Sequence, residues 1–205
     1  MDSLPGYKLE TAPIYKALKK WHENLPAPML KSLLADVQSL AQSLPSQSLS
    51  VGSACSGTDI STKVLETILM FWRRNFRIGM ELVSQFVCEK DPNKQRFLLQ
   101  NHSPQILVAD SAHLGQGSVY NLITRATVVL PYTMLFTAGF TCVSRSPLSC
   151  HRKDNKGCVE RGAEATGESF AQIFAYVQAS RPSIVILENV VQLMEKVIVM
   201  RQEDL

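Results

Sequence analysis

Short apolar segments with strand character alternate with helical segments from residue 49 to residue 187. We expect strands at 49–55, 81–88, 106–108, 134–138 and 184–187. Between them, apolar residues recur at the three- and four-residue spacing of a helix. Strands that alternate with helices in this way form a parallel sheet with helices on both faces. The sequence therefore predicts an α/β fold.

Two further segments have distinct local signals. Asp91 and Pro92 are typical of a helix N-cap followed by proline at the first helical position, which predicts a helix that ends near Asn101. Residues 143–168 are rich in serine, glycine and charge and have no clear period, so we expect a long loop there.

The first 47 residues have a different pattern from the rest. Apolar residues at helical spacing predict an amphipathic helix over 29–44 and a shorter helix over 13–22, with a proline-containing turn between them. We interpret 1–47 as a helical N-terminal extension and 48–205 as the main domain.

Composition excludes several classes of protein. With 45% apolar and 19% charged residues, the 205-residue chain has an ordinary globular composition, and its net charge of +3 does not by itself indicate a nucleic-acid binder. No segment approaches the roughly 20 apolar residues of a membrane span, and the N-terminus has no signal-peptide pattern. The odd number of cysteines favours a reducing compartment. We expect a soluble protein of the cytoplasm, or of the nucleus in a eukaryote.

Candidate ligand-binding residues follow the strands, because ligands bind at the carboxyl ends of parallel strands. Ser56 and Gly57 lie in the turn after the first strand, where backbone donors are free and the glycine lets a ligand approach. Glu89 follows the second strand and is suited to ribose hydroxyls. The alternatives are an exposed strand-end acid or an ion-pair partner of Lys90 or Lys94. Asp110 follows the third strand and either binds an adenine amino group or caps a helix. The glycine fingerprint of nicotinamide-dependent enzymes is absent.

Two reactive side chains follow later strands. Cys142 is either a buried structural thiol or a nucleophile that Arg145 and backbone donors stabilise as thiolate. Glu188 ends an aliphatic strand that we expect to be buried, and it is either a helix-capping acid or a carboxyl whose pKa is raised by desolvation. The spacing of Cys150, His151 and Cys158 matches no zinc site, so we expect no metal. We expect the cysteines at 55 and 88 to be packing residues.

Five segments, in this order, resemble motifs of the DNA cytosine-5 methyltransferase family. They are VGSACSGTDIS, FVCEKDPNKQRFLLQNH, ILVADSAHLG, TAGFTCVSRSPLS and RPSIVILENV. The resemblance implies a Rossmann-like, doubly wound, mostly parallel sheet that binds S-adenosylmethionine. It implies that Ser56 and Gly57 bind the methionine end of that cofactor, Glu89 the ribose and Asp110 the adenine.

The resemblance also implies a reaction. The Cys142 thiolate attacks carbon 6 of a flipped cytosine while Glu188 donates a proton to nitrogen 3, and carbon 5 then accepts the methyl group. Asn189 supports the geometry of the pocket. This chemistry suits the residues, since an aromatic carbon captures a methyl group only after a covalent adduct breaks its conjugation. The target base must leave the stack to be reached.

The segment after the cysteine resembles the family's mobile catalytic loop. Residues 143–156 hold four cations, including Arg145, Arg152 and Lys153, against one acid, a local charge of +3 that suits DNA phosphates. A solvated loop of mixed charge is the alternative reading of this composition. One branch of the family acts on transfer RNA, so RNA is an alternative substrate.

The sequence departs from the family in two ways. Thr141 stands before the cysteine, where proline is usual. The target-recognition region and the later motifs have no counterpart, so we expect an incomplete sheet with an exposed apolar edge. Either the chain is a fragment or a partner chain completes it. The alternative function is therefore that of a non-catalytic fragment, which binds cofactor or nucleic acid without turnover.

Overall fold

The computed structural model describes residues 11–140, 159, 162 and 164–189. The predicted nucleophile Cys142 and the predicted DNA-binding residues Arg145, Arg152 and Lys153 lie outside the described residues. The boundary between residues 47 and 48 remains a prediction.

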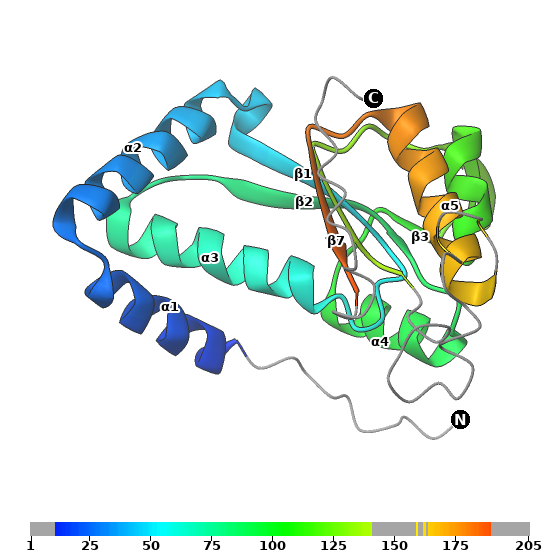
Figure 1. Ribbon diagram of the computed structural model, residues 1–205, viewed down its shortest axis with the longest axis horizontal. Coiled ribbons are helices and arrows are strands. Elements are labelled where there is room, and N and C mark those ends of the chain that lie inside the picture. Colours follow the sequence, from blue (N-terminus) through cyan, green and yellow to red (C-terminus); the bar gives the residue numbers. More distant parts are fainter. Residues whose placement is uncertain (1–10, 141–158, 160–161, 163, 190–205) are drawn as a thin grey trace.

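A five-stranded parallel sheet forms the centre of the structure, with strand order β3-β2-β1-β6-β7 (Figure 1). The strands are β1 Ser48–Ala54, β2 Glu81–Cys88, β3 Ile106–Val108, β6 Leu135–Gly139 and β7 Ile184–Glu188. The chain builds outward from β1 to β3 and then returns to the other side of β1. This reversal is a topological switch point, where α/β sheets bind ligands. The predicted Rossmann-like α/β fold is confirmed.

Helices cover both faces of the sheet because successive strand residues point in opposite directions. On β2, Val87 packs with Leu98 of α4 (Pro92–Asn101) on one face. Phe86 packs on the other face with Ile173 and Tyr176 of α5 (Glu164–Ser180). The second of these cores includes a tilted ring contact between Phe136 and Tyr176, with centroids 4.5 Å apart.

The N-terminal helices α1 (Ala12–Asn24) and α2 (Ala27–Ser43) pack against the sheet domain. Val37 and Ala41 of α2 share a core with Val51 of β1 and with Leu69 of α3 (Ile60–Phe76). The short helix η1 (Pro45–Gln47) leads from α2 into β1. The two helices predicted for this segment are confirmed, and each extends beyond its predicted start.

Between β3 and β6 the chain forms elements that the sequence analysis did not predict. These are the short helix η2 (Ser111–Gln116) and an antiparallel hairpin of β4 (Ser118–Asn121) and β5 (Ala126–Val129). Asn121 fixes the hairpin to β3, because its Oδ1 accepts hydrogen bonds from the Leu107 and Ile123 amides and its Nδ2 donates to the Gln105 carbonyl.

Two local predictions were wrong. The loop predicted over 143–168 ends earlier, since α5 begins at Glu164. The last strand was expected to be buried, yet Ile184, Ile186 and Leu187 of β7 are 47%, 50% and 41% exposed. The reason is that β7 is the edge strand of the sheet. This agrees with the expected exposed apolar edge.

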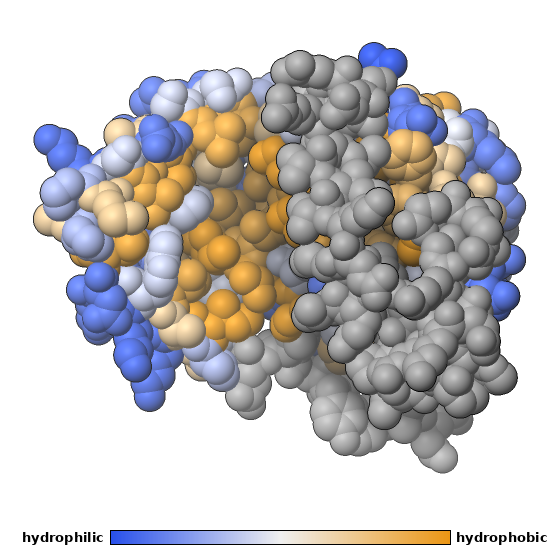
Figure 2. All heavy atoms as spheres, viewed as in Figure 1, coloured by the Kyte–Doolittle hydropathy of each residue, from blue (hydrophilic) through white to orange (hydrophobic). Residues whose placement is uncertain are grey.

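Apolar side chains gather on the face of the molecule seen in Figure 2, over the region that α2, α3 and the sheet occupy in Figure 1. No helix in the described part of the chain is both long and apolar enough to cross a membrane.

Candidate functional site

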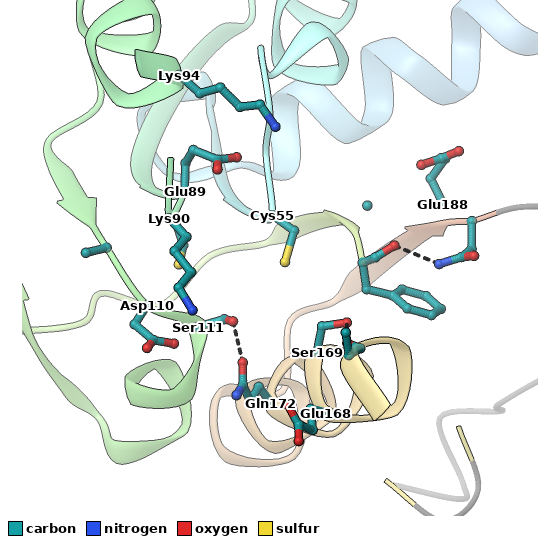
Figure 3. A pocket seen from close by; sticks show the side chains of 16 residues that line it. Cys55, Glu89, Lys90, Lys94, Asp110, Ser111, Glu168, Ser169, Gln172 and Glu188 are labelled. Carbon is teal, nitrogen blue, oxygen red and sulfur yellow. Dashed lines mark hydrogen bonds between the residues drawn. The ribbon is translucent and has the colours of Figure 1, made fainter. Parts of the chain in front are cut away.

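A cavity of about 540 Å³ lies at the carboxyl ends of the sheet strands (Figure 3). Its volume is in the range of small-molecule and cofactor sites. The lining comes from the ends of all five sheet strands, from η2, from Lys94 of α4 and from α5. It comprises Cys55, Cys88, Glu89, Lys90, Lys94, Ala109, Asp110, Ser111, Gly139, Phe140, Ala165, Glu168, Ser169, Gln172, Glu188 and Asn189.

Glu89 is held rigidly at the end of β2 and is only 7% exposed. Its Oε2 accepts a hydrogen bond of 2.7 Å from the Gly57 amide, and its Oε1 accepts one of 2.9 Å from the Asp91 amide. The alternatives of an exposed acid or a lysine partner were wrong, since Glu89 is buried and the ion pairs among the described residues join other groups. Each carboxylate oxygen keeps capacity for a further donor, such as a ligand hydroxyl.

The turn between β1 and α3 contains three residues with left-handed backbone: Cys55 at φ 51°, Gly57 at φ 56° and Asp59 at φ 49°. Such a conformation is costly for residues other than glycine and is typical of functional sites. A Cβ on Gly57 would meet nothing within 4 Å, so the glycine is needed here for its backbone conformation. The Ser56 hydroxyl lies 2.7 Å from that of Ser53 and donates to the Cys88 carbonyl.

In this turn Cys55 lines the cavity, whereas Ser56 and Gly57 do not. Gly57 reaches the site through its hydrogen bond to Glu89. The binding of a methionine end by Ser56 and Gly57 remains a prediction.

Asp110 lines the cavity at the end of β3 and caps η2, where its Oδ1 accepts a hydrogen bond of 3.0 Å from the Ala112 amide. The helix-cap alternative is therefore confirmed. The contact of Asp110 with adenine remains a prediction. Asp110 lines the cavity while it caps η2.

Cys55 and Cys88 were expected only to pack, but both line the cavity. Burial raises the pKa of the Cys55 thiol, the nearby carboxylates of Glu89 and Asp110 raise it further, and a hydrogen bond with Ser111 opposes the shift. Burial also raises the pKa of Cys88 strongly. Both groups are neutral thiols at physiological pH, which makes them poor nucleophiles.

Glu188 ends β7 and Asn189 follows it, and both line the cavity next to the end of β6. A Cβ on Gly139 would lie 3.1 Å from Glu188 Oε2, so the carboxyl group occupies the space that the glycine leaves. Asn189 Nδ2 donates a hydrogen bond of 2.7 Å to the Phe140 carbonyl (dashed in Figure 3). The Glu188 side chain is exposed, so the expected desolvation is not found. The cause is its position on the edge strand.

The structure thus brings Glu89, Asp110, Glu188 and Asn189 to one cavity. The predicted approach of Cys142 to Glu188 lies outside the described residues and remains a prediction. Phe140 is the last described residue before the cysteine and lies two positions ahead of it. It is beside the cavity, where its carbonyl accepts the hydrogen bond from Asn189.

The sequence analysis missed the wall that α5 contributes. Ala165, Glu168, Ser169 and Gln172 line the cavity, at the spacing of one helix face. Ser111 Oγ donates a hydrogen bond of 2.6 Å to Gln172 Oε1 across this wall. The signal was present, since small and polar residues recur at these positions while the apolar residues of α5 occupy another face.

The lining carries four carboxyl groups and two ammonium groups. The carboxyl groups belong to Glu89, Asp110, Glu168 and Glu188, and the ammonium groups belong to Lys90 and Lys94. This balance favours a ligand with positive charge. Within the described residues there is no cluster of three side chains that could hold a metal ion.

Comparison with known proteins gives a distant relative. The chain is 29% identical over 161 residues to the DNA (cytosine-5-)-methyltransferase DMT5 of Cryptococcus neoformans var. grubii, an alignment that covers 78% of this chain and 7% of the relative. The matched part is thus a small fraction of that protein. No protein-family model matches the chain. Together with the fold and the residues at the strand ends, this similarity identifies the chain as a distant homologue of a DNA cytosine-5 methyltransferase.

Proposed function

We propose that this chain carries the cofactor-binding and catalytic part of an enzyme that transfers a methyl group from S-adenosylmethionine to carbon 5 of cytosine in DNA. The observation that carries the proposal is the meeting of Glu89, Asp110 and Glu188 in one cavity at the switch point of the sheet. The similarity to a protein named as a DNA cytosine-5 methyltransferase supports the choice of reaction and substrate.

The residues of the cavity fit the cofactor. Two backbone amides hold the Glu89 carboxylate in place, so that it accepts further hydrogen bonds from ribose hydroxyls without rearranging. Asp110 lies at the end of the neighbouring strand, where it can accept from an adenine amino group. The excess of carboxyl groups suits the positive sulfonium, which supplies the electrophilic methyl group when the cofactor is bound.

Cys142 and Glu188 act on the cytosine. The thiolate of Cys142 forms a bond to carbon 6 while the Glu188 carboxyl donates its proton to nitrogen 3, which makes carbon 5 nucleophilic. After carbon 5 has taken the methyl group, loss of its proton expels the thiolate. A base that covers Glu188 removes the carboxyl from water, which favours its neutral form.

Asn189 positions this chemistry through its hydrogen bond to Phe140, which joins the end of β7 to the segment before Cys142. In the proposed complex, Arg145, Arg152 and Lys153 bind DNA phosphates, and a partner chain supplies target recognition. Extrusion of the cytosine from the duplex gives Cys142 and Glu188 access to its ring.

The test is methyl transfer from labelled S-adenosylmethionine to a cytosine-containing duplex by the 205-residue chain. We expect transfer by the wild-type chain and none by Cys142→Ser, because serine is a much weaker nucleophile toward carbon 6. A duplex with 5-fluorocytosine should trap a covalent complex, since fluorine at carbon 5 cannot leave as a proton does.

Other outcomes separate the alternatives. Transfer to transfer RNA but not to the duplex would indicate an RNA methyltransferase. Cofactor binding without transfer to either nucleic acid would indicate a binding module. Transfer that survives Cys142→Ser would contradict the proposed mechanism.

A further inference from the structure

Gln172 of α5 faces the end of the cavity that Asp110 and Ser111 form (Figure 3). Glu188 lies at the other side of the same view, with Cys55 between the two groups. Asp110 and Ser111 follow β3, which is the strand next to β2 in the sheet. A nucleoside whose ribose binds Glu89 at the end of β2 can therefore extend its base toward β3 and Gln172.

One hydrogen bond joins two elements along this wall. Ser111 Oγ of η2 donates to Gln172 Oε1 of α5 at 2.6 Å. A hydroxyl has one proton to donate, so the proton of Ser111 is used in this bond.

This bond fixes the Gln172 carboxamide with its oxygen toward Ser111. Its Nε2 then has two donor hydrogens, and no hydrogen-bond partner of Nε2 is found among the described residues.

We propose that Gln172 reads the purine base of the cofactor by donating a hydrogen bond from Nε2 to a ring nitrogen. The inference rests on the proposed function and deepens it. The bond from Ser111 turns the carboxamide oxygen toward η2 and leaves Nε2, with its two donor hydrogens, available to a base. Such a group selects an unprotonated purine nitrogen. Adenine has three in its rings, at positions 1, 3 and 7.

The experiment compares S-adenosylhomocysteine with its 1-deaza, 3-deaza and 7-deaza analogues, each of which replaces one ring nitrogen by a carbon. Dissociation constants are measured by calorimetry for the wild-type chain and for Gln172→Leu. We expect one analogue to bind wild type about tenfold more weakly than the parent compound, the effect of one lost hydrogen bond. That difference should disappear in Gln172→Leu, which has no donor to lose.

Gln178→Leu is the matched control, because Gln178 is an exposed glutamine of the same helix and is not among the lining residues. It should keep the wild-type order of the four ligands. Gln172→Glu is the second variant, since it keeps the length of the side chain and removes the donor. Gln172→Glu provides the same comparison if circular dichroism shows that Gln172→Leu does not fold.

The outcomes distinguish this inference from the proposed function. If all three analogues bind the variants of Gln172 with the same relative affinities as wild type, Gln172 does not read the base and the inference is overturned. If wild type binds none of the four compounds, the proposed cofactor site is itself wrong, and the inference falls with it. Retention of the wild-type order in Ser111→Ala would show that Ser111 does not orient the carboxamide.

Discussion

Asn189 Nδ2 donates a 2.7 Å hydrogen bond to the carbonyl oxygen of Phe140, and so joins the end of β7 to the segment after β6. The bond links the residue next to Glu188 with the residue two positions before Cys142. In the proposed reaction these are the proton donor and the nucleophile. The proposed alignment of these two groups therefore depends on a contact between two neighbouring strand ends rather than on either strand alone.

Asn189→Asp should slow methyl transfer by about tenfold or more, because the aspartate has the same shape but cannot donate to Phe140 and the reacting groups lose their alignment. Single-turnover rates with labelled cofactor measure the effect. Binding of S-adenosylhomocysteine should change little. An unaltered transfer rate would show that the bond does not position the reacting groups.

Gly139→Ala should displace the Glu188 carboxyl, because the new Cβ would lie 3.1 Å from Oε2. The exposed carboxyl can move, so we expect the free energy of unfolding to change by less than about 1 kcal/mol while methyl transfer falls. The matched control is Gly79→Ala, whose Cβ would meet only the Gln47 side chain, at 3.4 Å. Equal transfer rates for the two variants would argue against the role of Gly139.

Glu89→Gln should weaken cofactor binding and stability together. The amide has one acceptor oxygen, while the Gly57 and Asp91 amides both need an acceptor. One of these buried donors is left without its partner, at a cost of about 1–3 kcal/mol in the free energy of unfolding. Urea denaturation and calorimetry with S-adenosylhomocysteine measure the two effects.

The control for Glu89→Gln is Glu168→Gln. It removes a carboxylate from the same cavity but from an exposed position on α5. It should reduce cofactor affinity slightly through charge and leave stability unchanged. If both variants weaken binding equally, charge alone explains the role of Glu89.

Asn121→Ala should destabilise the chain by about 3 kcal/mol, since it removes two hydrogen bonds that fix the β4–β5 hairpin to the β3 segment and one within the hairpin turn. Asn121→Asp keeps the oxygen that accepts from Leu107 and Ile123, so its effect should be smaller. Urea denaturation gives both values. A larger loss for the aspartate variant would contradict this account.

Stability should fall as the pH rises above about 9. The pKa of Cys88 is raised from its ordinary value of 9.0, so the folded state holds the thiol proton after the unfolded state has released it. This contribution is complete below pH 9 and is lost progressively at higher pH. The free energy of unfolding from urea titrations between pH 7 and about pH 10 measures it. Cys88→Ala should have a flatter profile, and an unchanged slope would contradict the assignment.

The strands and caps were predictable from the sequence because they depend on local signals. The strands at 81–88 and 106–108 have the predicted bounds. The Asp91 cap also forms, with Oδ1 accepting a 2.7 Å hydrogen bond from the Asn93 amide. The β4–β5 hairpin was missed because its strands are short and its turn uses Arg125 at φ 56° rather than a glycine.

The site was predictable only in part for a physical reason. Glu89 and Asp110 each follow a strand and Glu188 ends one, and parallel strands bring their carboxyl ends together without further information. The exposure of Glu188 follows from the place of β7 at the edge, which depends on strand order rather than on local sequence. Likewise, Gln172 reaches the cavity through the packing of α5 on η2, and the sequence shows the small and polar face of α5 but not the element on which that face packs.

The hydrogen bond between the Gly57 amide and Glu89 has a thermodynamic consequence. The Glu89 carboxylate stabilises the turn between β1 and α3, which has unfavourable backbone angles, and in the proposed complex it also binds the ribose. Binding of the cofactor in the cavity and rigidity of this turn therefore increase together. The exchange rate of the Gly57 amide proton with solvent therefore reports on whether the cavity is filled, at a distance from the reacting atoms.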